Sequence, residues 1–251
     1  LSGKAIVAVA VAGFLVFATV RFIYAIPVTV LAGFLLLPPA YGFNPPFLPS
    51  ITKGNVIALS VVALAALFAP RRNGHGRLLP EHAAILRDTL PGLLPRAPWA
   101  IACLGLLLLG PLGTTLTNLE PVSVNGVVRP GLGLRDAINT VQRMALVVLP
   151  LLVARKFLGG EDGQRAVLFT LAAAGLAYSL PTLVEVRLSP QLHNWVYGYF
   201  QHSWIQHIRG DGFRPTVFLR HGLVLGLFLC MSLLAVRGYL RAIDADRRLL
   251  S

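Results

Sequence analysis

The sequence is short of charge, and of negative charge above all. Asp, Glu, Lys and Arg together make up 13% of its 251 residues, whereas an average soluble domain carries about 25%. Only 10 residues are acidic against 22 Lys and Arg, which gives a formal net charge of +12. With a hydrophobic fraction of 55% and a mean hydropathy of +0.71, this composition excludes an ordinary soluble enzyme.

Cysteine and metal-ligand patterns are also scarce. The two cysteines, Cys103 and Cys230, both lie inside apolar runs, where we expect them to be packing residues. His202 and His207 are five residues apart, so on a helix they would face different sides and do not have the spacing of zinc ligands. The sequence therefore predicts neither a metal nor a cofactor.

Long apolar runs alternate with loops that hold nearly all the Arg, Pro and acidic residues. Because about 20 apolar residues cross a hydrocarbon core of about 30 Å, these runs predict an all-α, polytopic transmembrane helical bundle of about seven spans. We expect one membrane domain over residues 1–251. The predicted spans are 5–20, 22–40, 54–70, 98–116, 137–154, 166–184 and 216–237.

The basic residues divide unevenly between alternate loops. Residues 71–97, residues 155–165 and the tail after residue 236 hold twelve Lys and Arg, and the opposite loops hold six. Positive residues collect on the cytoplasmic side of membrane proteins. Residues 71–97, residues 155–165 and the C-terminal tail are therefore expected in the cytoplasm. This explains the net charge without a nucleic-acid partner. The loop at 71–97, which mixes Arg with Leu and Pro, is expected to associate with anionic membrane lipids.

One outer segment, residues 185–221, concentrates groups that could do chemistry: four Arg, four His, two Trp and two Tyr. Arg209 and Arg214 flank two glycines that permit close backbone approach, and Pro215 could open the following helix. Two arginines before a helix N-terminus suit an anion. We therefore expect Arg209 and Arg214, with Gly212, to bind an anionic group.

Other residues of this segment have two interpretations each. Arg187 and Arg220 either join the anion site or have structural roles: Arg187 pairing with Glu185 or Asp211, and Arg220 extending to lipid head groups. Trp195 and Tyr197 either stack on a ligand or anchor the membrane interface. His207, and His221 one turn into the last span, could each act as a general base or form a structural hydrogen bond.

At this segment the sequence resembles the O-antigen ligase and polymerase superfamily, bacterial membrane glycosyltransferases similar to GT-C enzymes. The likeness lies in the Arg-x-x-Gly-aromatic element of Arg209, Gly212 and Phe213, preceded by EVRLSPQLHNWVYG, and extends more loosely to PPFLPSITKGNV. It implies an undecaprenyl-diphosphate-linked glycan donor, a lipid A core or polysaccharide acceptor, and no metal. It also implies an inner-membrane location with the functional loop, residues 185–215, facing the periplasm.

The resemblance includes a further block of spans and a second outer loop with another Arg and the catalytic His, so we expect this chain to be an N-terminal part of such an enzyme. Two other classes remain open. A transporter or flippase for an anionic lipid-linked saccharide would use the same arginines without breaking a bond. A non-catalytic membrane scaffold would not need them.

Overall fold

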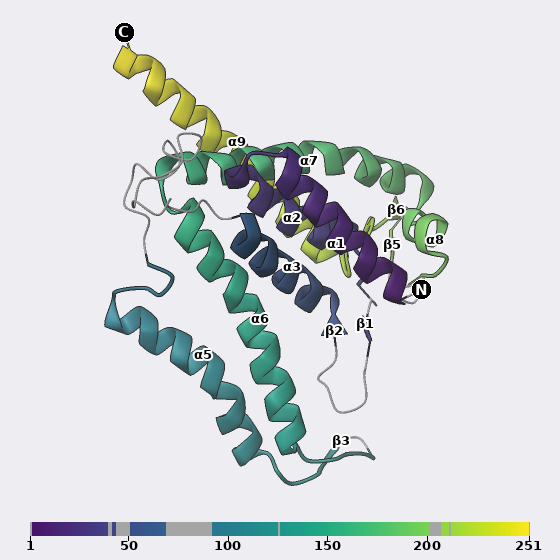
Figure 1. Cartoon of the computed structure of the whole chain (residues 1–251). Coiled ribbons are helices and arrows are strands. Elements are labelled where there is room, and N and C mark those ends of the chain that lie inside the picture. The colour runs from purple at the N-terminus through teal and green to yellow at the C-terminus, as the bar shows by residue number, and fades with distance from the viewer. Residues whose placement is uncertain are drawn as a thin grey trace.

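The computed structural model describes residues 2–39, 42–43, 51–68, 92–124, 126–200, 207–210 and 212–250. Within them the chain forms eight helices and three short β-hairpins (Figure 1). The helices are α1 (Ser2–Thr19), α2 (Phe22–Leu36), α3 (Lys53–Phe68), α5 (Pro98–Thr117), α6 (Leu134–Leu158), α7 (Glu161–Leu188), α8 (Leu192–Tyr197) and α9 (Gly222–Leu250). The predicted all-α helical bundle is thereby confirmed.

Seven of these helices lie on the seven predicted spans, and α8 is a short addition in the outer segment. By length and composition, four of them can cross a membrane: α5, α6, α7 and α9 as far as Ala245. Helices α2 and α3 are apolar but shorter. Helices α5 and α6 continue through Pro111 and Pro150, as expected where neighbouring helices satisfy the freed carbonyls. The chain is therefore a membrane protein.

The last predicted span, 216–237, is wrong at its start. Helix α9 begins at Gly222, so Pro215 does not open it. The backbone N–H groups of residues 216–218 are bound by side chains of α7, and Val217 has a φ of +51°. A left-handed residue and diverted N–H groups prevent helix formation until these constraints end.

The three hairpins join alternate helix pairs, and each consists of two antiparallel strands. The pairs are β1 with β2 (Gly42–Phe43, Ile51–Thr52), β3 with β4 (Val122–Val124, Val127–Arg129), and β5 with β6 (Ile208–Arg209, Gly212–Phe213). They lie between α2 and α3, between α5 and α6, and between α8 and α9. If α3 crosses the membrane once, as α5, α6 and α7 do, all three hairpins lie on the same side.

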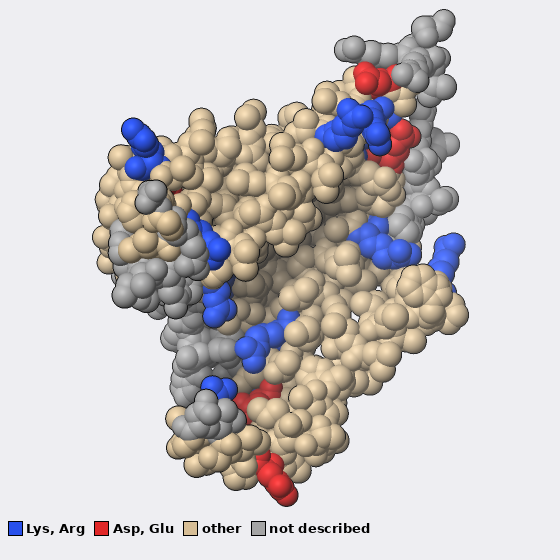
Figure 2. All heavy atoms as spheres, turned by 180° about the vertical axis from the view of Figure 1, so that it is seen from behind, with Lys and Arg blue, Asp and Glu red and all other residues tan. Residues whose placement is uncertain are grey.

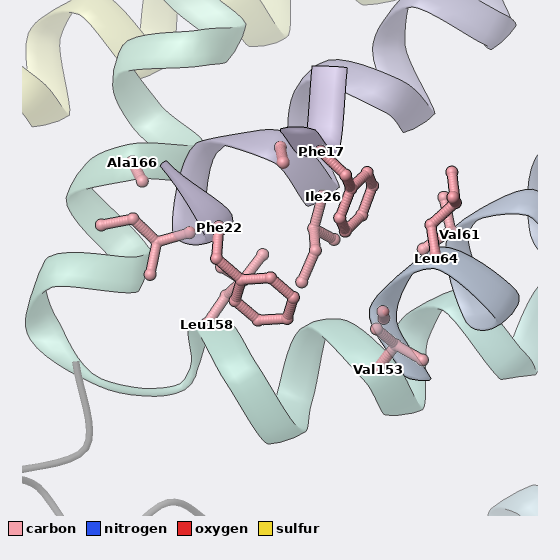
Figure 3. Packing of buried hydrophobic residues seen from close by; sticks show 11 residues of the cluster. Phe17, Phe22, Ile26, Val61, Leu64, Val153, Leu158 and Ala166 are labelled. Carbon is pink, nitrogen blue, oxygen red and sulfur yellow. The ribbon is translucent and has the colours of Figure 1, made fainter. Parts of the chain in front are cut away.

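A first apolar core joins α1, α2 and α3 to the end of α6 and the start of α7 (Figure 3). Phe22 packs edge-on against Phe17 at 5.9 Å and Phe157 at 5.1 Å between ring centroids. Ile26 and Val61 are almost fully buried among them. This core fixes α1–α3 against the end of α6 and the start of α7.

A second core lies near the outer segment and joins α2, α7 and α9. Its buried members are Leu35, Tyr178, Val217, Leu219, Leu225 and Phe228. Helices α7 and α9 approach closely at Gly175, where a Cβ atom would lie 2.3 Å from the Cβ of Ser232. Small residues allow such backbone approach between membrane helices. The core therefore holds residues 217–219 directly against the helical bundle.

The surface is consistent with a membrane protein. Apolar side chains such as Leu106, Leu176 and Leu234 are more than 70% exposed, as expected for residues that face lipid. Seen from behind, most visible Lys and Arg gather in two groups on opposite sides of the molecule, with a largely uncharged surface between them (Figure 2). Helix α5 packs along α6, and most of its surface is exposed.

Candidate functional site

The site begins with the β5–β6 hairpin, where Arg209 pairs with Gly212 and Ile208 with Phe213. Gly210 has a φ of +56°, a conformation that glycine adopts without strain in a tight turn. Gly212 is exposed. The structure describes Arg209 by its backbone alone, and Asp211 lies outside the described residues.

His207 and Arg214 close the hairpin. The Arg214 N–H donates to the His207 carbonyl at 2.8 Å, and the Arg214 carbonyl lies 3.3 Å from the His207 Nδ1. A carbonyl only accepts, so the Nδ1 carries the proton and the Nε2 keeps its lone pair in the neutral ring. His207 is only 3% exposed and stacks edge-on with Phe200. Its tautomer therefore matches that of a general base.

Arg214 continues from the hairpin to the start of α9. A Cβ atom added to Gly222 would lie 2.4 Å from the Cγ and Cδ of Arg214, so the arginine stem lies directly against the first residue of the helix. The side chain is half-buried, and no ion pair joins it to a carboxylate of the described residues. The structure thus places the aliphatic stem of Arg214 at the N-terminus of α9, the positive end of the helix dipole.

His221 is the residue before α9, not one turn inside the span as the sequence suggested. Its Nδ1 accepts the N–H of Leu223 at 3.2 Å, the bond that an N-capping side chain makes. An accepting Nδ1 puts the proton of the neutral ring on the Nε2. His221 is therefore arranged as a hydrogen-bond donor rather than as a base.

The sequence predicted only an ion pair for Glu185, and the structure gives this residue a different role. It is fully buried near the end of α7, and it accepts the N–H groups of Leu192, Thr216 and Val217 at 3.2, 2.8 and 2.7 Å. Of the alternatives for Arg187, the ion pair with Glu185 does not form in the described residues, because Glu185 is fully buried and Arg187 is exposed; Asp211, the other partner considered, lies outside the described residues. Arg187 itself is exposed in the last turn of α7.

Aromatic and histidine rings pack beside the residues that Glu185 binds. His193 is fully buried, its Nδ1 donates to the Tyr199 carbonyl at 2.8 Å, and its ring lies 4.7 Å from that of Tyr199 and 5.1 Å from that of Tyr197. Burial lowers the pKa of His193, and the nearby charge of Lys53 lowers it further. Burial likewise raises the pKa of Tyr197. The His193 ring is therefore held neutral.

The end of α2 is tied to this region by side chains from three other helices. Tyr178 donates to the Leu35 carbonyl at 3.0 Å, Tyr197 to the Leu36 carbonyl, and Lys53 to the carbonyls of Phe34 and Leu37. Tyr197, a candidate for ligand stacking, thus has a structural bond. Trp195 is 63% exposed and Arg220 is exposed, so neither lies within the packed site.

The structure therefore brings together His207, Arg214, His221 and the hairpin of Arg209 and Gly212, and it leaves Arg187, Arg220 and Trp195 on the surface. Across the part of the chain that the structure describes, no three His, Cys, Asp or Glu side chains form a metal-binding group. The loop at 71–91, the stretch at 44–50, and His202 and Trp204 lie outside the described residues. Comparison with known proteins finds no matching family model, curated protein or solved structure.

Proposed function

We propose that this chain is part of an O-antigen ligase-like membrane glycosyltransferase. The reaction would move a glycan from an undecaprenyl diphosphate carrier to lipid A core or to a growing polysaccharide, on the periplasmic side of a bacterial inner membrane. The observation that carries the proposal is the position of Arg214. Its half-buried stem lies on the first residue of α9, next to a histidine in the tautomer of a base.

Arg214 and the start of α9 would bind the diphosphate. The first N–H groups of a helix attract anions, and a guanidinium adds charge and a fork of donors that matches phosphate oxygens. Negative charge grows on the diphosphate as the glycosidic bond breaks, so fixed donors at that position lower the barrier. Arg209, across the hairpin from Gly212, would complete the clamp.

His207 would take the proton from the attacking hydroxyl of the acceptor. Its Nδ1 donates to the Arg214 carbonyl, which aims the ring and leaves the Nε2 as the acceptor of that proton. Since the ring is 3% exposed, the acceptor reaches the Nε2 only after this part of the site opens. His221 would act through the donor on its Nε2, which suits an oxyanion rather than a proton acceptor.

The test is glycan transfer by Arg214→Ala and Arg209→Ala in the complete protein, assayed in membranes with an undecaprenyl-diphosphate-linked oligosaccharide. Loss of a preorganised charge donor lowers turnover by about 100-fold or more, and membrane levels are expected to stay unchanged. Arg129→Ala is the control, because Arg129 is an exposed arginine in the β3–β4 hairpin. Normal transfer by Arg214→Ala would rule out the clamp.

The same assay separates the other classes. Movement of the lipid-linked saccharide across vesicles without transfer, lost in Arg214→Ala, would indicate a transporter or flippase. If Arg209→Ala and Arg214→Ala both replace the wild-type protein in the cell without any defect, a scaffold is indicated.

A further inference from the structure

Three successive backbone N–H groups in the segment before α9 are bound by side chains of one helix. Thr216 and Val217 donate to Glu185 Oε2 at 2.8 and 2.7 Å, and Phe218 donates to the Tyr178 hydroxyl at 3.1 Å. Thr216 and Val217 are fully buried. The N–H groups of residues 216–218 are therefore bound by side chains of α7 rather than by backbone carbonyls.

Val217 shows that the backbone conformation of this segment is imposed. Its φ of +51° lies in the left-handed region, where a β-branched side chain is strained. Such strain persists only where the surrounding structure over-determines the backbone. Here the surroundings are the Glu185 carboxylate on the N–H and the second apolar core around the side chain.

Residues 216–218 lie between Arg214 and His221, two residues of the candidate site. Arg214 lies two residues before Thr216, and His221 lies four residues after Val217. The Arg214 stem touches Gly222, so the chain folds back on itself around the anchor. A shift of Thr216 and Val217 would move Arg214 away from the start of α9.

We propose that Glu185 is the positioning residue of this site: its carboxylate holds Thr216 and Val217 so that Arg214 lies across the first turn of α9. This inference rests on the proposed function, because it assigns Glu185 to the diphosphate clamp. Glu185 acts through the backbone and does not touch the substrate.

The chemistry requires a carboxylate. Three N–H groups converge on two oxygens, Leu192 on Oε1 and the other two on Oε2, and a carboxylate offers acceptors on both atoms. Glutamine replaces one oxygen with an NH₂ group, which would face at least one N–H with another donor. Aspartate keeps both acceptors but is one methylene too short to reach both segments.

The first experiment measures the anchor itself by hydrogen exchange in the detergent-solubilised full chain. In Glu185→Gln, amides of a peptide covering residues 214–221 should exchange at least 10-fold faster than in the wild type, while amides inside α9 should not change. Glu120→Gln is the matched control, because Glu120 is an exposed acid near the β3–β4 hairpin. If Glu185→Gln does not fold, Glu185→Asp replaces it. Unchanged exchange at 216 and 217 overturns the proposal.

The second experiment measures binding of inorganic pyrophosphate to the same variants. We expect about 10-fold weaker binding for Glu185→Gln, less than a 2-fold change for Glu120→Gln, and a loss of 10-fold or more for Arg214→Ala. Because Glu185 acts through Arg214, the affinity for pyrophosphate of the double variant that carries both Glu185→Gln and Arg214→Ala should lie within 2-fold of that of Arg214→Ala alone. A purely structural role would instead weaken the double variant further.

The outcomes separate the two proposals. If Arg214→Ala binds pyrophosphate as well as the wild type, the proposed diphosphate site is wrong and the inference about Glu185 falls with it. If Arg214→Ala loses binding but Glu185→Gln binds like Glu120→Gln, the site stands and the positioning role of Glu185 is overturned.

Discussion

The Nζ atom of Lys53 donates to the carbonyl of Leu37 at 2.6 Å, and so ties the first residue of α3 to the last turn of α2. It donates to the Phe34 carbonyl at the same distance. The carbonyls at the end of a helix have no partner within the helix, and here a lysine supplies one for two of them. This bond closes the α2–α3 pair next to the candidate site.

Replacing Lys53 with Met should destabilise the protein by about 1–3 kcal/mol, since it removes the hydrogen bonds to two carbonyls at the end of α2, of which the one to Leu37 is partly buried. Thermal unfolding in detergent measures the effect. Lys156→Met is the control, because Lys156 is exposed and lies over the Phe157 ring. Equal unfolding temperatures for the two variants would show that the Lys53 bonds do not contribute to stability.

Gly175→Ala should lower the free energy of unfolding by about 1–3 kcal/mol, because the added Cβ would lie 2.3 Å from the Cβ of Ser232 and force α7 and α9 apart. The matched control is Gly226→Ala in α9, where an added Cβ meets nothing within 4 Å. That variant should be neutral or slightly more stable, since Ala favours helices. Similar losses in both variants would contradict the close approach of the two helices.

Stability should fall as the solution becomes acidic, in part because of His193. Burial keeps the pKa of His193 below its ordinary 6.5, so the unfolded chain takes up this proton first as the pH falls. The contribution is complete above about pH 6.5 and is lost as the pH falls through the folded-state pKa, by up to about 1.4 kcal/mol per pH unit. Between pH 8 and pH 5, the unfolding temperature should fall less steeply with decreasing pH in His193→Asn than in the wild type. An identical slope would exclude His193 as a source of it.

Membrane topology can be tested with reporters. A reporter fused after Gly198 should give a periplasmic signal and one fused after Gly160 a cytoplasmic signal. The reason is that Arg155, Lys156 and Arg165 flank Gly160, positive residues collect on the cytoplasmic side, and Gly198 follows the opposite end of α7. The reverse pattern would place the candidate site in the cytoplasm and remove the proposed donor from reach.

Transfer by the complete protein should survive EDTA. In the proposed site, the arginines and the start of α9 would provide the positive charge that a metal ion would otherwise supply at the diphosphate. Transfer assays with and without EDTA, followed by added Mg²⁺, measure this. A loss that Mg²⁺ reverses would give the metal a role in catalysis.

The helices were predictable because length and apolar composition are properties of continuous sequence. The helix boundaries follow the apolar runs wherever a loop interrupts them, as at Arg21 between α1 and α2. The start of α9 was not predictable, because the apolar residues Val217, Phe218 and Leu219 resemble the beginning of the apolar run that follows. Glu185 prevents this from 31 residues away, and no local pattern reports such a contact.

The candidate site was predictable in part for the same reason. The concentration of Arg and His indicated the segment, and its glycines indicated a turn. The roles within the segment depend on tautomers and contacts that only the fold determines: the Nδ1 of His207 donates, whereas the Nδ1 of His221 accepts. Glu185 gave no signal as a single acid beside Arg187, and the obvious ion pair between them does not form.

The length of α7 has a consequence for the lipid around it. Its 28 residues extend about 42 Å at 1.5 Å per residue, about 12 Å more than a hydrocarbon core of about 30 Å. The helix must therefore tilt or project from the bilayer. Glu185 lies in its last turns and holds residues 216–217, so the depth of the whole outer segment follows the angle of α7. The acyl chain length of the surrounding lipids, which sets the bilayer thickness, would thus also set the depth of Arg209 and Arg214 relative to the lipid phosphate groups.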